Sequence, residues 1–179
     1  MIFLMEKAIF CGGCFWCIEA VYKRIKGVDN IVSGYTGGFV KNPSYREVCN
    51  GTTGHAEGVK IDYNPSMVSY QDLLEIFFAV HDPTTINRQG NDIGSQYRSA
   101  IFFSNDIQKR IATKFISDLD NSNIFENPIV TTVEKFQLFY NSEDEHHNYY
   151  DLNTNQPYCN YIISPKIKLI KKIFKDKLK

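Results

Sequence analysis

The stretch from residue 11 to residue 17, Cys-Gly-Gly-Cys-Phe-Trp-Cys, constrains the fold of this chain more than any other. The short run 7–10 before it reads as a strand. The residues after it are apolar at positions 14, 17, 18, 21 and 25, which is the spacing of a helix with one buried face. Gly27 is a suitable C-cap for that helix. The sequence therefore predicts a strand, a glycine turn and a helix, with Cys14 at or beside the first helical turn.

A cysteine at that position is expected to carry chemistry. The first turn of a helix has unpaired N–H groups and the positive end of the helix dipole, so it lowers the pKa of a thiol and favours the reactive thiolate. Phe15 and Trp16 place apolar surface beside the Cys14 sulfur. Core packing is the alternative, because free cysteines are among the most buried residues. Three cysteines at this spacing on a glycine turn favour the chemical interpretation.

Length and charge limit what else the chain can be. With 179 residues, we expect one domain over residues 1–179 with its own core. The hydrophobic content of 43% excludes a disordered chain, and a formal net charge of zero gives no reason to expect nucleic acid or a membrane as partner. The apolar run within 1–6 is too short for a signal peptide, so we expect a cytoplasmic protein whose five cysteines are thiols or metal ligands. No heptad seam is present, and we expect a monomer.

Periodicity and turn residues predict the other elements. Strand patterns cover 28–33, 59–63, 98–103, 129–133 and 158–163, and helix patterns cover 69–80, 107–119, 142–152 and the lysine-rich residues from 164 on. Capping boxes at Ser69 with Asp72 and at Ser142 with Glu145 mark two helix starts. Polar loops at 41–54 and 83–96 are long enough to indicate function. Because strands and helices do not strictly alternate, we expect an α+β fold, a two-layer ferredoxin-like plait with a mixed sheet, helices packed on it, extended loops and a C-terminal segment.

The cysteine motif leaves metal binding and general dithiol chemistry open. Cys11-x2-Cys14-x2-Cys17 begins like an iron–sulfur ligand run, but the fourth position is Val21 and no proline follows it. A zinc site needs four ligands; other cysteines and four histidines are available, but none forms a second paired motif. Cys14-x2-Cys17 at a helix start is also the arrangement of a thioredoxin-like dithiol.

Polar residues in the loops are weaker candidates when judged by position alone. Glu57 precedes a strand at a loop-rich rim, where most acids are merely solvated. Tyr45 and Tyr97 are of the residue type that usually packs its ring and finds a partner for its hydroxyl. The pair His146-His147 is expected to cap or decorate an exposed helix.

Longer motifs carry a family resemblance. They are Gly13-Cys14-Phe15-Trp16, Ser33-Gly34-Tyr35, Asn-Pro-Ser-Tyr-Arg-Glu-Val at 42–48, Thr-Gly-His-Ala-Glu at 53–57, His-Asp-Pro-Thr at 81–84, the run 89–100, Phe139-Tyr140 and Tyr158-Cys159. Taken in this order over nearly the whole chain, they resemble the peptide methionine sulfoxide reductases of the A type.

The resemblance implies an enzyme that reduces methionine (S)-sulfoxide, free and in proteins, without a cofactor. A sulfoxide sulfur is electrophilic only when its oxygen is protonated or strongly hydrogen-bonded. The implied nucleophile is therefore Cys14 and the implied acid Glu57, and the product leaves a sulfenic acid on Cys14. The other implied site residues are the hydroxyl donors Tyr45 and Tyr97, the supporting polar group Asp92, and the walls of the methyl pocket, Phe15 and Trp16.

The resemblance also implies a resolving cysteine and a thioredoxin-type reductant. Cys159 matches the family's C-terminal resolving cysteine, but the glycine-rich tail common around it is replaced by residues 160–163, Asn-Tyr-Ile-Ile. Cys17 stands where many relatives have glycine, one helical turn from Cys14, and is the alternative or relay partner. Cys11 and Cys49 are expected to be structural thiols.

Overall fold

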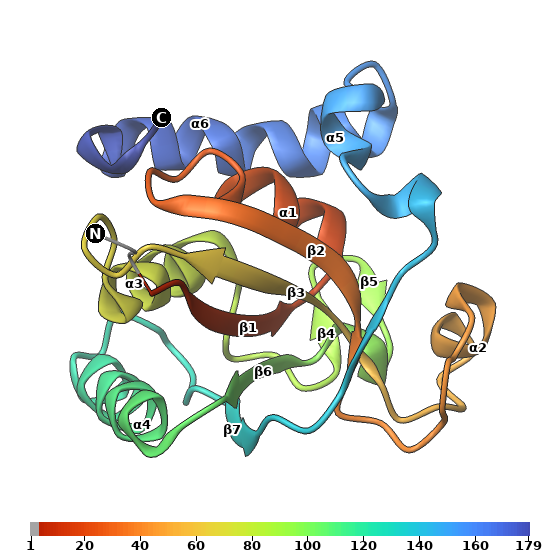
Figure 1. Cartoon of the computed structure of the whole chain (residues 1–179), viewed down its shortest axis with the longest axis horizontal. Coiled ribbons are helices and arrows are strands. Elements are labelled where there is room, and N and C mark those ends of the chain that lie inside the picture. Colours follow the sequence, from red (N-terminus) through yellow and green to blue (C-terminus); the bar gives the residue numbers. More distant parts are fainter. Residues whose placement is uncertain (1–3) are drawn as a thin grey trace.

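A six-stranded mixed sheet in the order β7-β6-β1-β3-β2-β8 forms the frame of the computed structural model, which describes residues 4–179 (Figure 1). The strands are β1 (Glu6–Gly12), β2 (Val28–Thr36), β3 (Ala56–Tyr63), β6 (Ser99–Phe103), β7 (Thr132–Lys135) and β8 (Phe139–Asn141). All neighbouring strands are antiparallel except the parallel pair β6–β7. The expected α+β class with a mixed sheet is confirmed. Part of the short apolar run at the N-terminus, residues 1–3, lies outside the described residues.

Helices and a small hairpin complete the fold. The helices are α1 (Phe15–Tyr22), α2 (Tyr45–Cys49), α3 (Tyr70–Val80), α4 (Asp106–Asn121), α5 (Tyr149–Leu152) and α6 (Ser164–Ile173). Strands β4 (Arg88–Gln89) and β5 (Asp92–Ile93) pair in a separate hairpin inside the second polar loop. Short 3-10 turns are η1 (Ser95–Tyr97), η2 (Asp144–His146) and η4 (Lys175–Lys177), and η3 (Cys159–Ile163) is a π-helical turn. Among residues 4–179, no helix is long and apolar enough to cross a bilayer.

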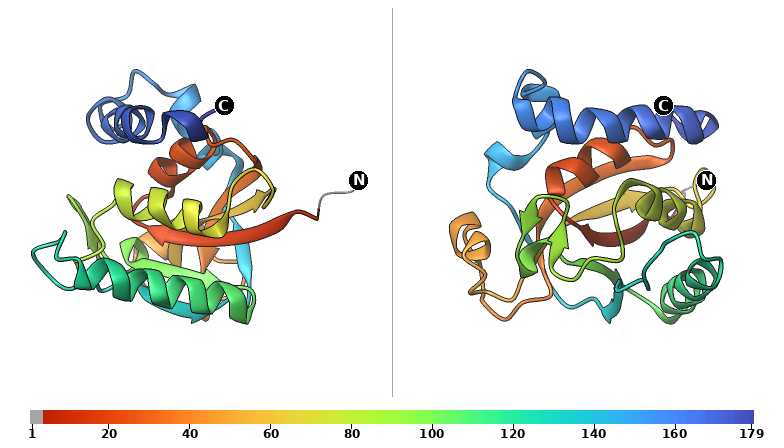
Figure 2. Two further views of the ribbon diagram at one scale, coloured as in Figure 1. Left: turned by 90° about the vertical axis from the view of Figure 1, so that its left-hand side faces the viewer. Right: turned by 180° about the vertical axis from the view of Figure 1, so that it is seen from behind.

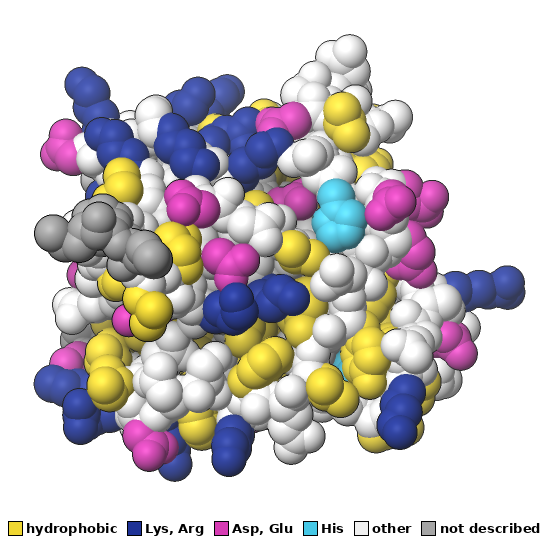
Figure 3. All heavy atoms as spheres, in the orientation of Figure 1, with side chains coloured by type: hydrophobic (Ala, Val, Ile, Leu, Met, Phe, Trp, Pro, Cys, Tyr) yellow, Lys and Arg dark blue, Asp and Glu magenta, His cyan; other side chains and the backbone are white. Residues whose placement is uncertain are grey.

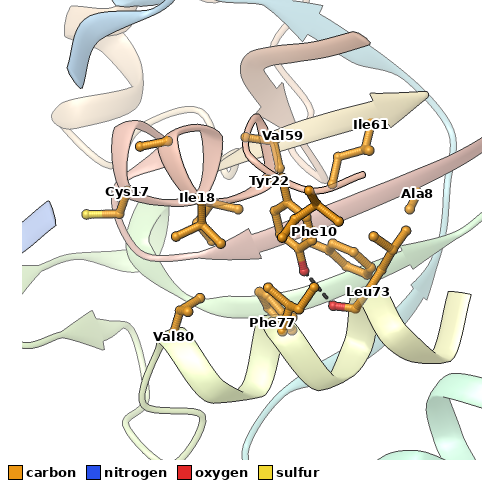
Figure 4. Close-up of a cluster of buried hydrophobic side chains, with 14 of the residues drawn as sticks. Ala8, Phe10, Cys17, Ile18, Tyr22, Val59, Ile61, Leu73, Phe77 and Val80 are labelled. Atoms are coloured by element: carbon orange, nitrogen blue, oxygen red, sulfur yellow. Dashed lines mark hydrogen bonds between the residues drawn. The ribbon is translucent and has the colours of Figure 1, made fainter. Parts of the chain in front are cut away.

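The main core lies between one face of the sheet and helices α1 and α3. Phe10 of β1 stacks on Phe77 of α3 at 5.0 Å and on Tyr22 of α1 at 5.7 Å between ring centroids (Figure 4). The buried Tyr22 hydroxyl donates to the carbonyl of Leu73 at 2.6 Å, so its polar atom is satisfied. Each such fully buried side chain contributes roughly 1.5–3 kcal/mol to folding. This packing ties the turn that carries Cys14 to the most rigid part of the molecule.

Helices α6, α3 and α4 lie one above another at one side of the molecule (Figure 2, left). Helix α3 is the middle of the three and contacts both of the others. The predicted helices at α3 and α4 are confirmed, and the predicted capping box of α3 is present because Ser69 and Asp72 accept each other's backbone N–H. The C-terminal helix is amphipathic as expected, with Ile167 and Ile170 buried and its lysines gathered on the surface above it (Figure 3).

The predicted last strand, 158–163, is wrong. These residues form the turn η3, which runs directly into α6. The β-branched residues there look strand-like, but Ile163, Ile167 and Ile170 repeat at helical spacing, and all three are buried in the core to which α1 and α3 also contribute. Tertiary burial of that face decides the conformation, and Pro165 is compatible with it at the start of α6.

Three other local predictions need correction. Helix α1 ends at Tyr22 rather than near Gly27, because the C-terminal residues take the backbone groups that would extend it: Lys26 N–H donates to the carbonyl of Lys177, and Lys179 N–H to that of Arg24. Ser142 does not cap a helix.

The N–H and the hydroxyl of Ser142 both donate to the carbonyl of Ser33, each at 3.0 Å, and only the short elements η2 and α5 follow Ser142. The strand expected at 129–133 is found slightly later, as β7.

Candidate active site

Cys14 lies at the N-cap position of α1, at the point where β1 turns into the helix. Gly13 makes that turn with φ +90°, a conformation open to glycine, and a side chain there would collide with Gln89 at 2.5 Å. The Cys14 side chain is 8% exposed and lines a cavity of about 250 Å³. The structure thus places this nearly buried sulfur at the helix start, as predicted, in the wall of the cavity.

The pKa prediction for Cys14 is wrong in direction. Burial, together with a hydrogen bond to Cys17, raises the pKa of the Cys14 thiol, whereas that hydrogen bond lowers the pKa of Cys17. The helix end cannot compensate, because the first-turn N–H of Phe15 is bonded to another group. Within this pair the Cys14 thiol therefore holds its proton more tightly than the Cys17 thiol does.

The group that accepts the Phe15 N–H is the carboxyl of Glu57. Strand β3 carries Glu57 opposite Tyr35 of β2, and its Oε2 accepts the Phe15 N–H at 3.1 Å. The side chain is 1% exposed, and burial raises its pKa to about 8. Glu57 therefore holds a proton near neutral pH, beside the residue that follows Cys14.

The hairpin β4–β5 supplies the floor of the cavity. Gln89 packs on Gly13 and clamps the backbone of Asp82 with two hydrogen bonds, each 3.0 Å long. Asp92, on the other strand of the hairpin, accepts a hydrogen bond from the hydroxyl of Tyr158 at 2.8 Å. The same hydroxyl lies 3.8 Å from the sulfur of Cys17. A continuous polar path therefore runs from Asp92 through Tyr158 to the two thiols.

Tyr45 and Tyr97 reach the site from the two long polar loops. Tyr45 begins α2 and stacks on Phe15 at 6.4 Å between ring centroids. Burial raises the pKa of both tyrosines, and the nearby Glu57 carboxylate raises both further. Both hydroxyls therefore keep their protons and can donate. The structure brings the predicted Cys14, Glu57, Tyr45, Tyr97 and Asp92 into one site.

An aromatic wall bounds the site on the side of the C-terminal segment. Phe15 is 1% exposed, and Trp16 lies flat on Tyr149 of α5, with centroids 3.6 Å apart and planes at 6°. His146 fills the corner between Tyr45 at 4.3 Å and Phe15 at 5.4 Å. These rings shield Phe15, whose N–H binds the Glu57 carboxyl, and Glu57 is itself only 1% exposed.

His146 corrects the expectation of an exposed helix decoration. Its side chain is buried, and neither ring nitrogen has a hydrogen-bond partner within the described residues. Glu143 anchors the same segment, accepting from the Tyr35 hydroxyl and from the Tyr45 backbone N–H at 2.8 Å each.

Sequence reasoning missed Tyr158 and His146 as site residues, and it missed α2. The signal for α2 was present, since Ser44 and Glu47 form a capping box that begins the helix at Tyr45. For Tyr158, the signal in the sequence was its position next to Cys159, a predicted site residue.

The other cysteines occupy three different environments. Cys159 is fully buried at the start of η3. Burial raises the pKa of Cys159, and the nearby Cys17 raises it further. Cys11 lies on the opposite face of the sheet, where burial raises its pKa to about 12. Cys49 is half-buried, and burial raises its pKa. Between residues 4 and 179, no three histidine, cysteine or acidic side chains cluster in a way that could hold a metal ion.

Comparison with known proteins identifies the family. The family model described as peptide methionine sulfoxide reductase matches residues 6–178. The chain belongs to this family. Peptide methionine sulfoxide reductase MsrA of Saccharolobus solfataricus is 51% identical over 175 residues, covering 98% of each chain.

Solved structures of the family agree with the fold. Mxr1 from Saccharomyces cerevisiae in reduced form is 34% identical, with a TM-score of 0.78 over 87% of this chain and 89% of that one. Mxr1 in complex with Trx2 is 26% identical, with a TM-score of 0.54 over 81% and 84%. The reductase described here therefore shares its architecture with a yeast member of the family.

Proposed function

We propose that this protein reduces methionine (S)-sulfoxide, free and in proteins, to methionine through a thiol cycle that needs no cofactor. The observation that carries the proposal is the shared end of α1, where Cys14 and the protonated Glu57 lie beside the same residue, Phe15. A nucleophile and an acid so arranged can act on one sulfur–oxygen bond from its two ends. The family membership supports the same reaction.

In the first step the Cys14 sulfur attacks the sulfoxide sulfur while Glu57 protonates the departing oxygen. As the Cys14 sulfur forms its new bond, its S–H becomes strongly acidic and the proton passes to the neighbouring Cys17. The protonated oxygen then bonds to the Cys14 sulfur as the bond between Cys14 and the substrate sulfur breaks, which leaves a sulfenic acid on Cys14 and releases methionine. The sulfoxide is reduced by two electrons and Cys14 is oxidised by two. Tyr45 and Tyr97 donate hydrogen bonds to the oxygen, and Phe15 and Trp16 receive the methyl group, while Asp92 supports the polar end of the substrate.

In the second step a neighbouring thiol resolves the sulfenic acid. Cys17 is in contact with Cys14, and a separation of three residues in a helix brings the two Cα atoms to roughly the distance that a disulfide needs. Its attack forms the Cys14–Cys17 disulfide and releases water. Cys159 then attacks the Cys17 sulfur, which frees Cys14 as a thiolate and leaves a Cys17–Cys159 disulfide. Cys159 is thus the final resolving cysteine and Cys17 the relay.

A dithiol of the thioredoxin class then reduces that disulfide and is itself oxidised. The complex of the yeast relative with Trx2 supports this partner. A cycle of free thiols suits the cytoplasm, which is the compartment that we propose for a monomeric enzyme. We also propose that residues 1–179 are a single domain whose central strands, β6-β1-β3-β2 with crossovers α1 and α3, form a ferredoxin-like plait, a label that their order supports.

The test is one turnover with methionine (S)-sulfoxide and no reductant, followed by mapping of the disulfides by mass spectrometry. With one equivalent of substrate per chain, the wild type should release one methionine and end with a Cys17–Cys159 bond, and Cys159→Ala should stop at Cys14–Cys17. Absence of oxidation at Cys14 would contradict the function itself. A Cys14–Cys159 bond in Cys17→Ala, formed as fast as any bond in the wild type, would remove the relay and keep the reaction.

A general dithiol oxidoreductase is distinguished by its acid requirement. Exchange between protein disulfides needs no proton donor to a sulfoxide oxygen. Glu57→Gln that kept full disulfide-exchange activity and full sulfoxide activity would favour that class instead.

A further inference from the structure

An open groove continues from the catalytic cavity across the surface between α3, α6 and the loop after α4. It encloses about 690 Å³, and its apolar lining includes Val80, Ile124, Phe125 and Leu169. It lies at the side of the molecule where α6, α3 and α4 are stacked (Figure 2, left). The reaction proposed above uses no residue of this apolar lining.

The groove and the catalytic cavity share two lining residues, Gln89 and Lys166. Both side chains are held in place by hydrogen bonds to backbone groups. Gln89 clamps the backbone of Asp82, and the Lys166 ammonium donates to the carbonyl of Val80. Gln89 and Lys166 therefore form a fixed ridge, the Gln89–Lys166 saddle, which separates the groove from the cavity that holds the two thiols.

The groove also exposes apolar side chains that nothing else in the described chain covers. Ile124 is 70% exposed and Leu169 is 36% exposed. Large exposed apolar side chains that line one concave surface are typical of a binding site. Asp82, Glu126 and Lys166 in its lining add two negative formal charges and one positive, and a net charge of only −1 gives no preference for a strongly charged ligand.

We propose that this groove binds the polypeptide on one side of a methionine sulfoxide residue, and that it favours apolar side chains there. The inference rests on the function proposed above. With the sulfoxide side chain at Cys14, the chain that carries it leaves the cavity over the Gln89–Lys166 saddle and enters the groove. Free methionine sulfoxide fills only the cavity, so the groove adds affinity and rate for peptides alone.

The experiment compares kcat/KM for free methionine (S)-sulfoxide and for two blocked peptides, with dithiothreitol as reductant. In the peptides, three leucines or three serines flank one methionine (S)-sulfoxide on each side. The wild type should prefer the leucine peptide roughly 10-fold, the effect of burying about two methylene groups. Ile124→Asp, and the double variant with Leu169→Asp, should lower kcat/KM for the leucine peptide roughly 10-fold while leaving that for the free amino acid within about twofold.

Ile107→Asp is the matched control, because Ile107 is also exposed but lies at the start of α4, outside the groove lining. It should leave all three substrates unchanged. Equal loss for free and peptide substrates, or no loss for the leucine peptide, would overturn the proposal. So would a loss that appears only when thioredoxin replaces dithiothreitol, since the groove would then be a reductant surface. Failure of the wild type to reduce free methionine sulfoxide would instead overturn the function on which the proposal rests.

Discussion

Cys14 and Cys159 belong to the same site but are held in different ways. Cys14 stands on a turn whose strand and helix form the centre of the core, and Glu57 comes from the neighbouring central strand. Cys159 comes from the segment 142–163, which covers the site and joins it through hydrogen bonds of the Glu143 carboxylate, the Asn148 backbone N–H and the Tyr158 hydroxyl. The difference separates two tasks: the rigid side sets the geometry of the oxygen transfer, and the covering side carries the thiol that must move.

The largest effect is expected from the rigid side. Cys14→Ser should lower kcat by about 10⁴-fold or more, because the reaction then lacks a nucleophile of sufficient reactivity. Methionine formation is measured by chromatography, with Cys11→Ala as the control because Cys11 lies on the other face of the sheet. Retained activity would mean that a thiol of the covering side is the nucleophile, and that the two sides do not have separate tasks.

Glu57→Gln should lower kcat by roughly 10²–10⁴-fold, the usual contribution of a positioned acid. In the wild type, activity should fall as pH rises through about 8, where Glu57 loses the proton that it donates. In the variant, this alkaline fall should be absent. An unchanged pH–rate profile in the variant would show that another group supplies the proton.

The same substitution should change the pH dependence of folding. The folded-state pKa of Glu57 is raised from 4.5 to about 8, so the stability that its proton provides is complete at acid pH and is lost as pH rises through about 8. The free energy of unfolding of the wild type should therefore fall, relative to Glu57→Gln, by roughly 4 kcal/mol between pH 4 and pH 9. Denaturant unfolding at both pH values measures this. If the free energy of unfolding changed equally with pH in the two proteins, Glu57 would not be buried as a neutral acid.

The smallest effect is expected on the covering side. Tyr158→Phe removes the hydrogen bond to Asp92, and the segment around Cys159 should open more often, by roughly fivefold for a bond worth about 1 kcal/mol. Hydrogen exchange of residues 153–163 should speed up accordingly, while β1 and β3 stay protected. Tyr161→Phe is the control, because that ring is 79% exposed. Equal acceleration in the control, or acceleration in β1, would show that the two sides open together.

The sequence predicts the rigid side better than the covering side, for a physical reason. The elements around Cys14, α3 and α4 show their own periodicity and caps, so local patterns suffice. The conformation of 142–163 depends on partners distant in sequence: Ser142 donates to Ser33, and Asn148 N–H donates to the carboxyl of Glu19. The burial that raises the pKa of Cys14 is likewise a property of the assembled core and outweighs the helix end.

The stack of Trp16 on Tyr149 gives the reductase an optical signal of its own. Trp16 is the only tryptophan in the chain, so all indole emission originates in the active site. Its ring stacks on Tyr149 and on His146, both of which belong to the covering segment. Any step that lifts residues 142–163 exposes the indole to water, so fluorescence recorded in a stopped-flow instrument resolves substrate entry, disulfide transfer and reduction without a label.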